Sequence, residues 1–237
     1  MSVAIVFGAS GSIGSAIGGH LQAQGFAVIG VGRNKNSASP PQFSSWIIWN
    51  EDAGEFSCSL SEQLAGKKID AIVWAQGANL NDDIDSFDLT KHLQMYEANV
   101  TFILRSLQAL LQVGFLAKNA RLVVISSIWQ NIARQTKLSY CITKSALQGL
   151  VQSLSIDLGR QGILINAVLP GALDTPMTRA NLQEHQISAL EGATPLQSLP
   201  NLSDVTGLTA YLCSQSNTGI TGQFIAADRG FSNARIL

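Results

Sequence analysis

Short, almost continuously apolar runs alternate along this chain with longer amphipathic stretches. The runs lie at residues 3–7, 26–31, 46–49, 70–75, 121–126, 163–169 and 222–227. The amphipathic stretches lie near residues 12–24, 88–113, 138–160 and 203–213. Strands become this apolar when helices cover both faces of their sheet. The pattern therefore predicts an α/β fold, in which about seven parallel strands form a doubly wound sheet with helices on both faces.

Nothing in the sequence divides the chain into two domains. We find no internal repeat and no long linker, so residues 1–237 are expected to form a single domain. Residues 34–45, rich in Ser, Pro and Asn, are expected to form a surface loop within it. Residues 176–201 carry weaker strand signals and lie late between two core elements, so we expect them to form a lid over a substrate.

The composition argues against several kinds of partner. Charged residues make up 13% of the chain and the formal net charge is −1, so no basic excess indicates nucleic acid or an anionic membrane. No apolar stretch reaches the roughly 18 residues that a membrane span needs. Cys58, Cys141 and Cys213 lie far apart without a CxxC motif, which favours reduced thiols and a cytoplasmic protein. No spacing typical of a metal site links the three histidines, His20, His92 and His185.

A glycine-rich segment, FGASGSIG, follows the first predicted strand and opens a predicted helix. It places Gly8, Gly11 and Gly14 at the turn. A strand-to-helix turn of this kind aims backbone N–H groups and a helix N-terminus at a phosphate, and glycine lets the backbone approach the ligand closely. The segment therefore predicts nucleotide binding. A tight turn in an α/β domain that binds no nucleotide is the alternative.

The end of the second predicted strand indicates which dinucleotide binds. An acidic residue there would bond the ribose 2′-hydroxyl of NAD. This strand instead ends in Gly32, Arg33 and Asn34, without a carboxylate. The planar guanidinium of Arg33 could pair with a 2′-phosphate, and the Ser10 hydroxyl could add to the same contact. The sequence therefore favours NADP(H) over NAD(H), unless Arg33 is an ordinary solvated loop residue.

Tyr140 and Lys144 stand four residues apart on a predicted helix, and hence on one face of it. Neither side chain titrates near pH 7 by itself. A lysine cation beside the tyrosine favours the phenolate, so we expect Lys144 to lower the pKa of Tyr140. A tyrosine tuned in this way can donate a proton in a reduction and accept one in an oxidation. Taken alone, such a pair is more often a packed ring beside a solvated cation.

Five segments, in order and at matching separations, resemble motifs of one family, the short-chain dehydrogenases/reductases, in its compact single-domain branch. They are GASGSIG (8–14), EANV (97–100), SS (126–127) with SYCITK (139–144), INAVLPGALDTPM (165–177) and ITGQFIAADRG (220–230). The resemblance covers essentially the whole chain. It implies a Rossmann-type fold and an oxidoreductase that moves a hydride between a nicotinamide cofactor and a small carbonyl or alcohol substrate.

The resemblance also implies roles for particular residues. Tyr140 would be the general acid or base, assisted by Lys144, which would also hold the ribose hydroxyls of the cofactor. Ser127 would hydrogen-bond the carbonyl oxygen of the substrate, and Asn99 would hold a water that relays protons toward Lys144. Thr175 would bind the nicotinamide carboxamide. The full set expected to bind the cofactor is Gly8, Ser10, Gly11, Ser12, Ile13, Gly14, Arg33, Asn34, Ala75, Gly77, Tyr140, Lys144, Pro170, Gly171 and Thr175.

The chain departs from the family pattern at three places. The threonine that usually precedes the first glycine is Phe7 here, which we expect to be structural. The usual Asn-Asn-Ala-Gly after the fourth strand reads WAQG at residues 74–77, which puts the local hydrogen bonding in doubt. The acidic residue usually seen after the third strand has no clear counterpart, although Asn50 or Asp52 could contact the adenine.

The leading prediction is an NADP(H)-dependent carbonyl reductase or alcohol dehydrogenase. A non-catalytic NADP(H)-binding regulator on the same fold remains open. Within the family, a 3-oxoacyl carrier-protein reductase also remains open, but it would need a basic patch for an acidic carrier protein. The candidates for such a patch do not cluster in the sequence: Arg105, Lys118, Arg121, Lys137 and Arg179.

Further expectations concern the surroundings of the site. Trp129 follows the catalytic serine closely and could line the substrate pocket, whereas the other tryptophans, at positions 46, 49 and 74, are expected in the core. A polar lid with Arg179, Asn181 and Gln183 could suit a sugar or a small hydroxylated ketone. In relatives, the helices that correspond to 88–113 and 138–160 pack against a second subunit, so the resemblance implies a homodimer or homotetramer.

Overall fold

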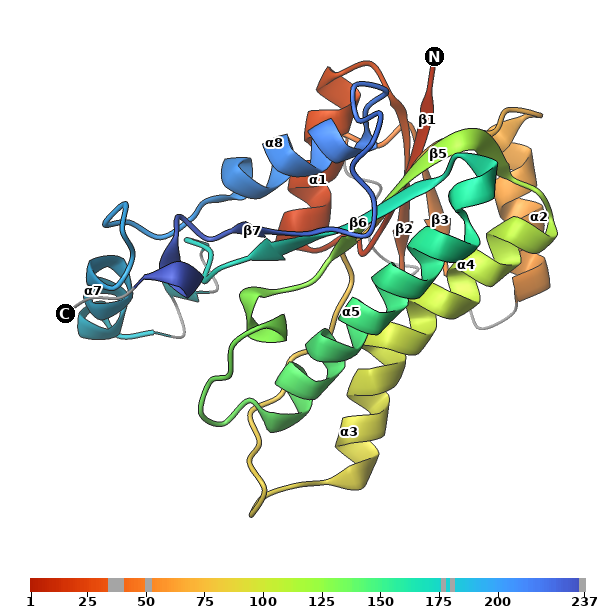
Figure 1. Cartoon of the computed structure of the whole chain (residues 1–237). Coiled ribbons are helices and arrows are strands. Elements are labelled where there is room, and N and C mark those ends of the chain that lie inside the picture. Colours follow the sequence, from red (N-terminus) through yellow and green to blue (C-terminus); the bar gives the residue numbers. More distant parts are fainter. Residues whose placement is uncertain (34–40, 50–52, 176–177, 180–181, 235–237) are drawn as a thin grey trace.

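The computed structural model describes residues 1–33, 41–49, 53–175, 178–179 and 182–234. Seven strands form one parallel sheet in the spatial order β3-β2-β1-β4-β5-β6-β7 (Figure 1). Their bounds are β1 Val3–Phe7, β2 Ala27–Gly32, β3 Ser45–Ile48, β4 Ile69–Trp74, β5 Leu116–Ile125, β6 Leu164–Pro170 and β7 Phe224–Ala227. Each apolar run predicted as a strand forms one, and the predicted fold class is confirmed. The largest difference is at β5, which begins at Leu116, before the apolar run at 121–126 from which it was predicted. The apolar pattern did not reveal this start, because Lys118 and Asn119 are exposed.

Helices connect the strands and cover the sheet. Their bounds are α1 Ser12–Ala23, α2 Ala53–Leu64, α3 Leu89–Tyr96, α4 Phe102–Gln112, α5 Leu138–Asp157, α7 Glu184–Gly192 and α8 Leu202–Cys213. A π-helical turn, Glu97–Thr101, joins α3 to α4, so these three elements replace the single helix predicted over 88–113. No helix in the part of the chain that the structure describes is both long and apolar enough to span a membrane.

Two helices, α2 and α7, are absent from the sequence prediction. Serines at alternate positions of α2 lower its helical propensity, because their hydroxyls compete for backbone hydrogen bonds. Phe56, Leu60 and Leu64 nevertheless form a buried stripe at helical spacing, and burial of this stripe stabilises the helix. The α7 segment lies within the region predicted as a lid. Figure 1 shows it beyond the carboxyl end of β6, away from the sheet.

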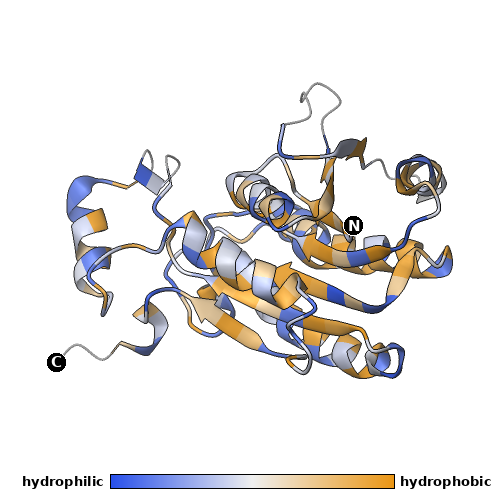
Figure 2. Ribbon diagram, turned by 90° about the horizontal axis from the view of Figure 1, so that it is seen from above, coloured by the Kyte–Doolittle hydropathy of each residue, from blue (hydrophilic) through white to orange (hydrophobic). Residues whose placement is uncertain are grey.

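Alternating side chains of each strand supply two separate cores. In β1, Val3, Ile5 and Phe7 pack in the cluster that includes α2, α4 and α5, whereas Ala4 and Val6 pack in the cluster that includes α1 and α8. This follows from the two-residue period of a strand. Figure 2 shows hydrophobic residues concentrated on the strands, between helices with mixed surfaces. The sheet is therefore covered on both faces, as a doubly wound fold requires.

Phe7 belongs to an aromatic cluster in the first of these cores. Its ring is fully buried and stacks on Trp74 with centroids 5.9 Å apart and planes at 3°. Trp49 adds an edge contact to Phe7, with centroids 6.1 Å apart. Trp74 is fully buried and its Nε1 donates to Ser106 Oγ at 2.9 Å. The structure thus gives Phe7 the packing role that we expected, and Trp74 is a core residue.

The order of the strands reverses direction at β1, which lies between β2 and β4. Ligands of open α/β sheets bind in the crevice outside the carboxyl ends of the strands at such a point. The chain leaves β1 through Gly8, whose φ of +74° lies in the left-handed region. Most of the loop predicted at 34–45 lies outside the described residues, but Phe43 near its end is buried in the core around α1.

Candidate active site

The loop after β1 lies directly against the loop after β4. A Cβ atom built on Gly8 would lie 2.7 Å from Gln76 Cα and 2.8 Å from Ala75 C, and one on Gly14 would lie 2.8 Å from Gly8 C. Glycine is therefore required at both positions by backbone contacts. The helix α1 begins at Ser12, and its N-cap residue Gly11 provides no side-chain cap. Backbone N–H groups at this end are thus available for an anion, as a dinucleotide phosphate would need.

A first cavity of about 180 Å³ adjoins this loop. Six residues predicted to bind the cofactor line it, namely Gly8, Ser10, Gly11, Arg33, Ala75 and Gly77. Trp49, Gln76 and Phe102 also line it, although the sequence reading did not assign them there. Asn34, Asn50 and Asp52 lie outside the described residues.

Gln76 is the clearest sign that a polar ligand belongs in the first cavity. Its amide Nε2 and Oε1 are both buried without a hydrogen-bond partner among the described residues. A buried amide without partners is costly, and a ligand with polar groups would satisfy it. The family pattern Asn-Asn-Ala-Gly has an alanine at this position, so the Gln76 amide adds buried polar groups that the pattern lacks.

A second cavity, the central cavity, has a volume of about 450 Å³ and shares Gly11, Ala75 and Gly77 with the first. The other predicted site residues in its wall are Ser12, Ile13, Ser127, Tyr140, Pro170, Gly171 and Thr175. These residues come from the carboxyl ends of β1, β4, β5 and β6 and from α1 and α5. The fold thus brings widely separated segments to one cavity that adjoins the glycine loop.

Tyr140 stands in the first turn of α5, with Lys144 one turn behind it. The Lys144 Nζ lies 5.7 Å from the Tyr140 ring centroid and donates to the Ile125 carbonyl at 3.2 Å. Burial raises the pKa of Tyr140, and a hydrogen bond with the Ser127 hydroxyl acts in the opposite direction. This corrects our expectation that Lys144 sets the pKa of Tyr140 below its ordinary value. Tyr140 is therefore protonated at neutral pH and is ready to donate.

Ser127 follows β5 and is buried at the wall of the central cavity. Its Oγ accepts a hydrogen bond from the Trp129 N–H at 3.3 Å and so caps a short 3₁₀ turn, Ile128–Gln130. The same hydroxyl bonds the side chain of Tyr140. Ser127 thus has two roles. It caps the local turn, and it also contacts the tyrosine directly.

Asn99 lies on the π-helical turn and is buried. Its Nδ2 donates to the Ala78 carbonyl at 3.1 Å and to Thr143 Oγ1 at 2.9 Å, while its Oδ1 accepts from the Ala78 N–H at 2.7 Å. Asn99 therefore ties the loop after β4 to α5. Single π-helical turns within longer helices occur often at functional sites.

A second set of bonds, which the sequence did not reveal, fixes the start of α5. The Asp82 carboxylate accepts from the Ser139 N–H at 3.0 Å and from its hydroxyl at 2.5 Å. The Lys137 ammonium donates to Asn79 Oδ1 at 2.7 Å and to the Leu80 carbonyl at 3.3 Å. These contacts hold residues 79–82 against 137–139 and so position Tyr140. Lys137 also lines the central cavity.

The segment after β6 closes the other side of the central cavity. The Gly171 N–H donates to the Ala227 carbonyl at 3.2 Å, and a Cβ on Gly171 would lie 3.0 Å from Asp228 Cβ. Thr175 Oγ1 accepts from the Thr178 N–H at 3.2 Å, so this hydroxyl is part of a local turn at the cavity wall. Trp129 also lines the cavity, as we expected of a pocket residue.

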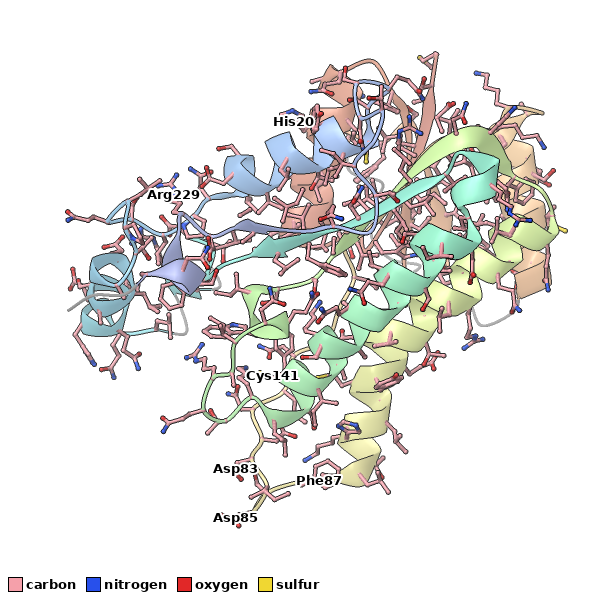
Figure 3. All side chains as sticks on the ribbon, in the orientation of Figure 1. His20, Asp83, Asp85, Phe87, Cys141 and Arg229 are labelled. Atoms are coloured by element: carbon pink, nitrogen blue, oxygen red, sulfur yellow. The ribbon has the colours of Figure 1, made fainter. Side chains whose placement is uncertain are left out.

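The histidines do not assemble into a site. His20 lies on α1, far from Cys141 in the first turn of α5 (Figure 3). His92 Nδ1 lies 2.9 Å from Ser139 Oγ, and His185 belongs to α7. Within the described ranges, no three His, Cys, Asp or Glu side chains are grouped as a metal ion would require.

The burial of Lys144 makes protein stability depend on pH. Burial lowers its pKa from 10.5 to about 8, so between these values the unfolded chain binds more protons than the folded one. The free energy of unfolding then rises with pH across this window. Each pKa unit corresponds to about 1.4 kcal/mol. We therefore expect the difference between the wild type and Lys144→Met to shift by about 2–3 kcal/mol in favour of the wild type on going from pH 8 to pH 10.5.

Urea unfolding at several pH values measures this shift. Exposed Lys67 provides the control, because Lys67→Met should unfold in parallel with the wild type at every pH. If the free energy of unfolding of Lys144→Met also followed that of the wild type at every pH, the pKa of Lys144 would not be lowered in the folded protein.

Comparisons with known proteins agree with this geometry. A short-chain dehydrogenase/reductase family model, described as "Enoyl-(Acyl carrier protein) reductase", matches residues 51–232. The chain is 29% identical over 245 residues to the uncharacterized oxidoreductase YmfI of Bacillus subtilis, covering 96% of this chain and 98% of that protein. It is 25% identical over 238 residues to the 3-oxoacyl-[acyl-carrier-protein] reductase FabG of Escherichia coli, covering 96% of each.

A solved structure shows the same fold. The gluconate 5-dehydrogenase of Burkholderia cenocepacia, in complex with NADP and tartrate, superimposes with a TM-score of 0.89 at 22% identity. The match covers 99% of this chain and 96% of that chain. The chain therefore belongs to the short-chain dehydrogenase/reductase family, whose members are oxidoreductases that bind nicotinamide cofactors.

Proposed function

We propose that this protein transfers a hydride between NADP(H) and a carbonyl or alcohol substrate, with Tyr140 as the general acid or base. The main support for this proposal is that Tyr140 and Ser127 line one cavity, which adjoins the glycine loop. Lys144 is buried directly behind the tyrosine. When bound, the nicotinamide would supply or accept the hydride. The glycine loop and Gln76 would hold the dinucleotide.

Each side chain then has a defined task in a reduction. Tyr140 donates its hydroxyl proton to the substrate oxygen, as its raised pKa allows at neutral pH. The Ser127 hydroxyl donates a hydrogen bond to the same oxygen and stabilises the charge that develops there. The Lys144 ammonium stabilises the phenolate left on Tyr140 and holds the cofactor ribose.

Asn99 would act through a water on the path to Lys144. A methyl-sized point built on Gly77 lies 3.1 Å from Asn99 Oδ1 and 3.7 Å from Lys144 Nζ. Because Asn99 Oδ1 uses one lone pair on Ala78, its other lone pair could accept a hydrogen bond from a water between these groups. This supports the relay role proposed for Asn99.

Arg33 should determine the preference for NADP(H). Its exposed side chain lines the first cavity, where it could pair with a 2′-phosphate. A bidentate charged contact contributes about 1.5–3 kcal/mol. We therefore expect Arg33→Ala to lower kcat/KM for NADPH about tenfold to a hundredfold, mainly through KM, and to leave NADH almost unchanged. Steady-state kinetics with both cofactors measure this, with exposed Arg160→Ala as the matched control. A wild type that prefers NADH would remove this role from Arg33.

The direct test of the function follows the absorbance of the reduced nicotinamide. NADPH and NADH are offered separately with ketones, aldehydes, keto-sugars and 3-oxoacyl thioesters. Oxidation of NADPH that depends on a carbonyl substrate supports the proposal. If NADPH binds tightly and no carbonyl is reduced, the non-catalytic regulator becomes the better account.

The carrier-protein alternative gains no support from the basic residues considered for it. Arg105 pairs with Glu97 at 3.1 Å, and Arg179 pairs with Asp174 at 2.6 Å. Arg121 and Lys137 are both buried. Of the five candidates, only Lys118 is then exposed without an ion pair among the described residues, so these side chains do not form a patch that an acidic carrier protein could contact.

We also retain three broader expectations as proposals. One sheet draws strands from both ends of the chain, which supports a single domain with a lid at 176–201. The three cysteines are unpaired, which supports a reducing, cytoplasmic environment. The helices α3, α4 and α5 expose large apolar side chains, which supports a homodimer or homotetramer: Leu89, Leu93, Leu104, Ile142 and Ile156.

A further inference from the structure

A third cavity, the α7 cavity, lies between α7 and the carboxyl ends of the strands. Its volume is about 430 Å³, which lies within the range of small-molecule sites. Most of its wall is apolar and includes Ile128, Trp129, Leu182, Leu190, Leu199 and Phe231. Arg229 braces this region (Figure 3), since it bonds Asp204 Oδ2 at 2.9 Å and Ser198 Oγ at 2.6 Å. These bonds fix the backbone next to Leu199 and Asp228, which line the cavity.

The α7 cavity adjoins the place where the carbonyl would react. Trp129 and Arg134 line both the α7 cavity and the central cavity. The Trp129 ring meets Phe231 edge-on, with centroids 6.3 Å apart, and so forms an apolar wall at the junction. A substituent on a carbonyl carbon near Tyr140 could thus extend past Trp129 into apolar surroundings.

The charges at this junction are positive. Arg134 lies over the Trp129 ring at 5.9 Å and has no carboxylate within ion-pair distance among the described residues. Lys137 lines the central cavity nearby. The carboxylate in the wall of the α7 cavity, Asp228, is buried and accepts hydrogen bonds from Gly230 and Ser232. A substrate anion would therefore meet Arg134 without competition from this acid.

Of the polar lid residues predicted to suit a sugar, the two that the structure describes, Arg179 and Gln183, line neither the central cavity nor the α7 cavity. Arg179 pairs with Asp174 and lines a different pocket, not the central or the α7 cavity. Gln183 forms the capping box at the start of α7. Asn181 lies outside the described residues. The side chains that line both cavities are those of the aromatic Trp129 and the cationic Arg134.

Building on the proposed function, we propose that the substrate is an oxo acid or the matching hydroxy acid. Its apolar chain occupies the α7 cavity and its carboxylate pairs with Arg134. In the reduction, the carbonyl carbon gains a hydride from NADPH and the carbonyl oxygen gains the Tyr140 proton. The products are a hydroxy acid and NADP⁺.

A substrate series tests both halves of this proposal. The probes are oxooctanoates with the carbonyl at carbon two, three or four, their methyl esters, their shorter homologues and hexose-derived ketones. We expect kcat/KM to rise with chain length by up to about fourfold per methylene, the limit set by complete burial. We expect an acid to exceed its ester by about tenfold or more, because the ester cannot form a charged hydrogen bond with Arg134.

Two variants assign these effects to the structure. Arg134→Gln should lower kcat/KM for the acids about tenfold, mainly through KM, and leave the esters unchanged. Ala193→Phe places a ring in the α7 cavity, whose wall includes Ala193. It should abolish the gain with chain length and leave the shortest oxo acid unaffected. Unchanged turnover of the esters shows that Arg134→Gln has folded. Unchanged turnover of the shortest oxo acid shows the same for Ala193→Phe.

The outcomes separate this proposal from the proposed function. Faster reduction of hexose-derived ketones, or equal rates for acids and esters, would overturn the substrate class and leave hydride transfer standing. If no carbonyl is reduced, the proposed function fails. The binding of a fatty acid then tests the proposed oxo-acid site separately. Octanoate should still raise the melting temperature of the wild type and not of Arg134→Gln, whereas no such difference would overturn the oxo-acid site.

Discussion

Replacing Tyr140 by phenylalanine should lower kcat by about two to four orders of magnitude, the usual contribution of a general acid, and leave cofactor affinity nearly unchanged. The variant keeps the ring beside Lys144 and removes only the hydroxyl that bonds Ser127 and would protonate the substrate. Turnover is measured by nicotinamide absorbance, and NADPH binding by its fluorescence.

The fold provides a matched control for this variant. Tyr211 is half-exposed on α8, on the opposite side of the sheet from α5, so Tyr211→Phe should be fully active. If Tyr140→Phe keeps near-normal turnover, Tyr140 is not the proton donor. Loss of NADPH binding together with activity would instead indicate that the hydroxyl holds the cofactor site in shape.

Introducing alanine at Gly8 should destabilise the protein by several kcal/mol and abolish dinucleotide binding. The residue has a φ of +74°, and a Cβ there would lie 2.7 Å from Gln76 Cα and 2.8 Å from Ala75 C. The left-handed conformation alone costs about 1–2 kcal/mol with a side chain. The overlap adds to this, because the atoms in conflict are backbone and cannot rotate away. It would also force the loops after β1 and β4 apart, where the phosphates are expected.

Gly25 separates the two effects. Its φ of +88° is also left-handed, but a Cβ there meets no atom within 4 Å. Gly25→Ala should therefore cost only about 1–2 kcal/mol and bind NADPH normally. Urea unfolding and NADPH titration measure both variants. Equal losses of stability in the two would show that the loops can separate without penalty.

Much of the fold could be predicted because local patterns carried it. Seven apolar runs became seven strands, since a strand covered on both faces has no position left for polar side chains. The spacing of Gly8, Gly11 and Gly14 predicted a turn in which two of them meet backbone atoms. The helix α2 was missed although Phe56, Leu60 and Leu64 carried the pattern, because its serines obscured it.

The candidate site could be predicted in part, through residues that a motif identifies. Tyr140 and Ser127 do line one cavity with the residues expected around the cofactor. Gln76 was noted only as a departure from the family, and its buried, unpartnered amide became visible once the surrounding loops were placed. Lys137 was considered for a surface patch, but it is buried and bonds residues 79 and 80.

The sequence by itself determined the strands, the glycine loop, the tyrosine–lysine spacing and the family. These depend on neighbours within a few positions, which a linear pattern records. Only the tertiary structure decided the pKa of Tyr140, because it depends on burial by segments distant in the chain. The same holds for the apolar cavity beneath α7, whose wall joins residues near 128, 190 and 231. Separation along the chain does not indicate which side chains are buried together. Their common burial determines both the pKa of Tyr140 and the apolar character of the cavity beside it.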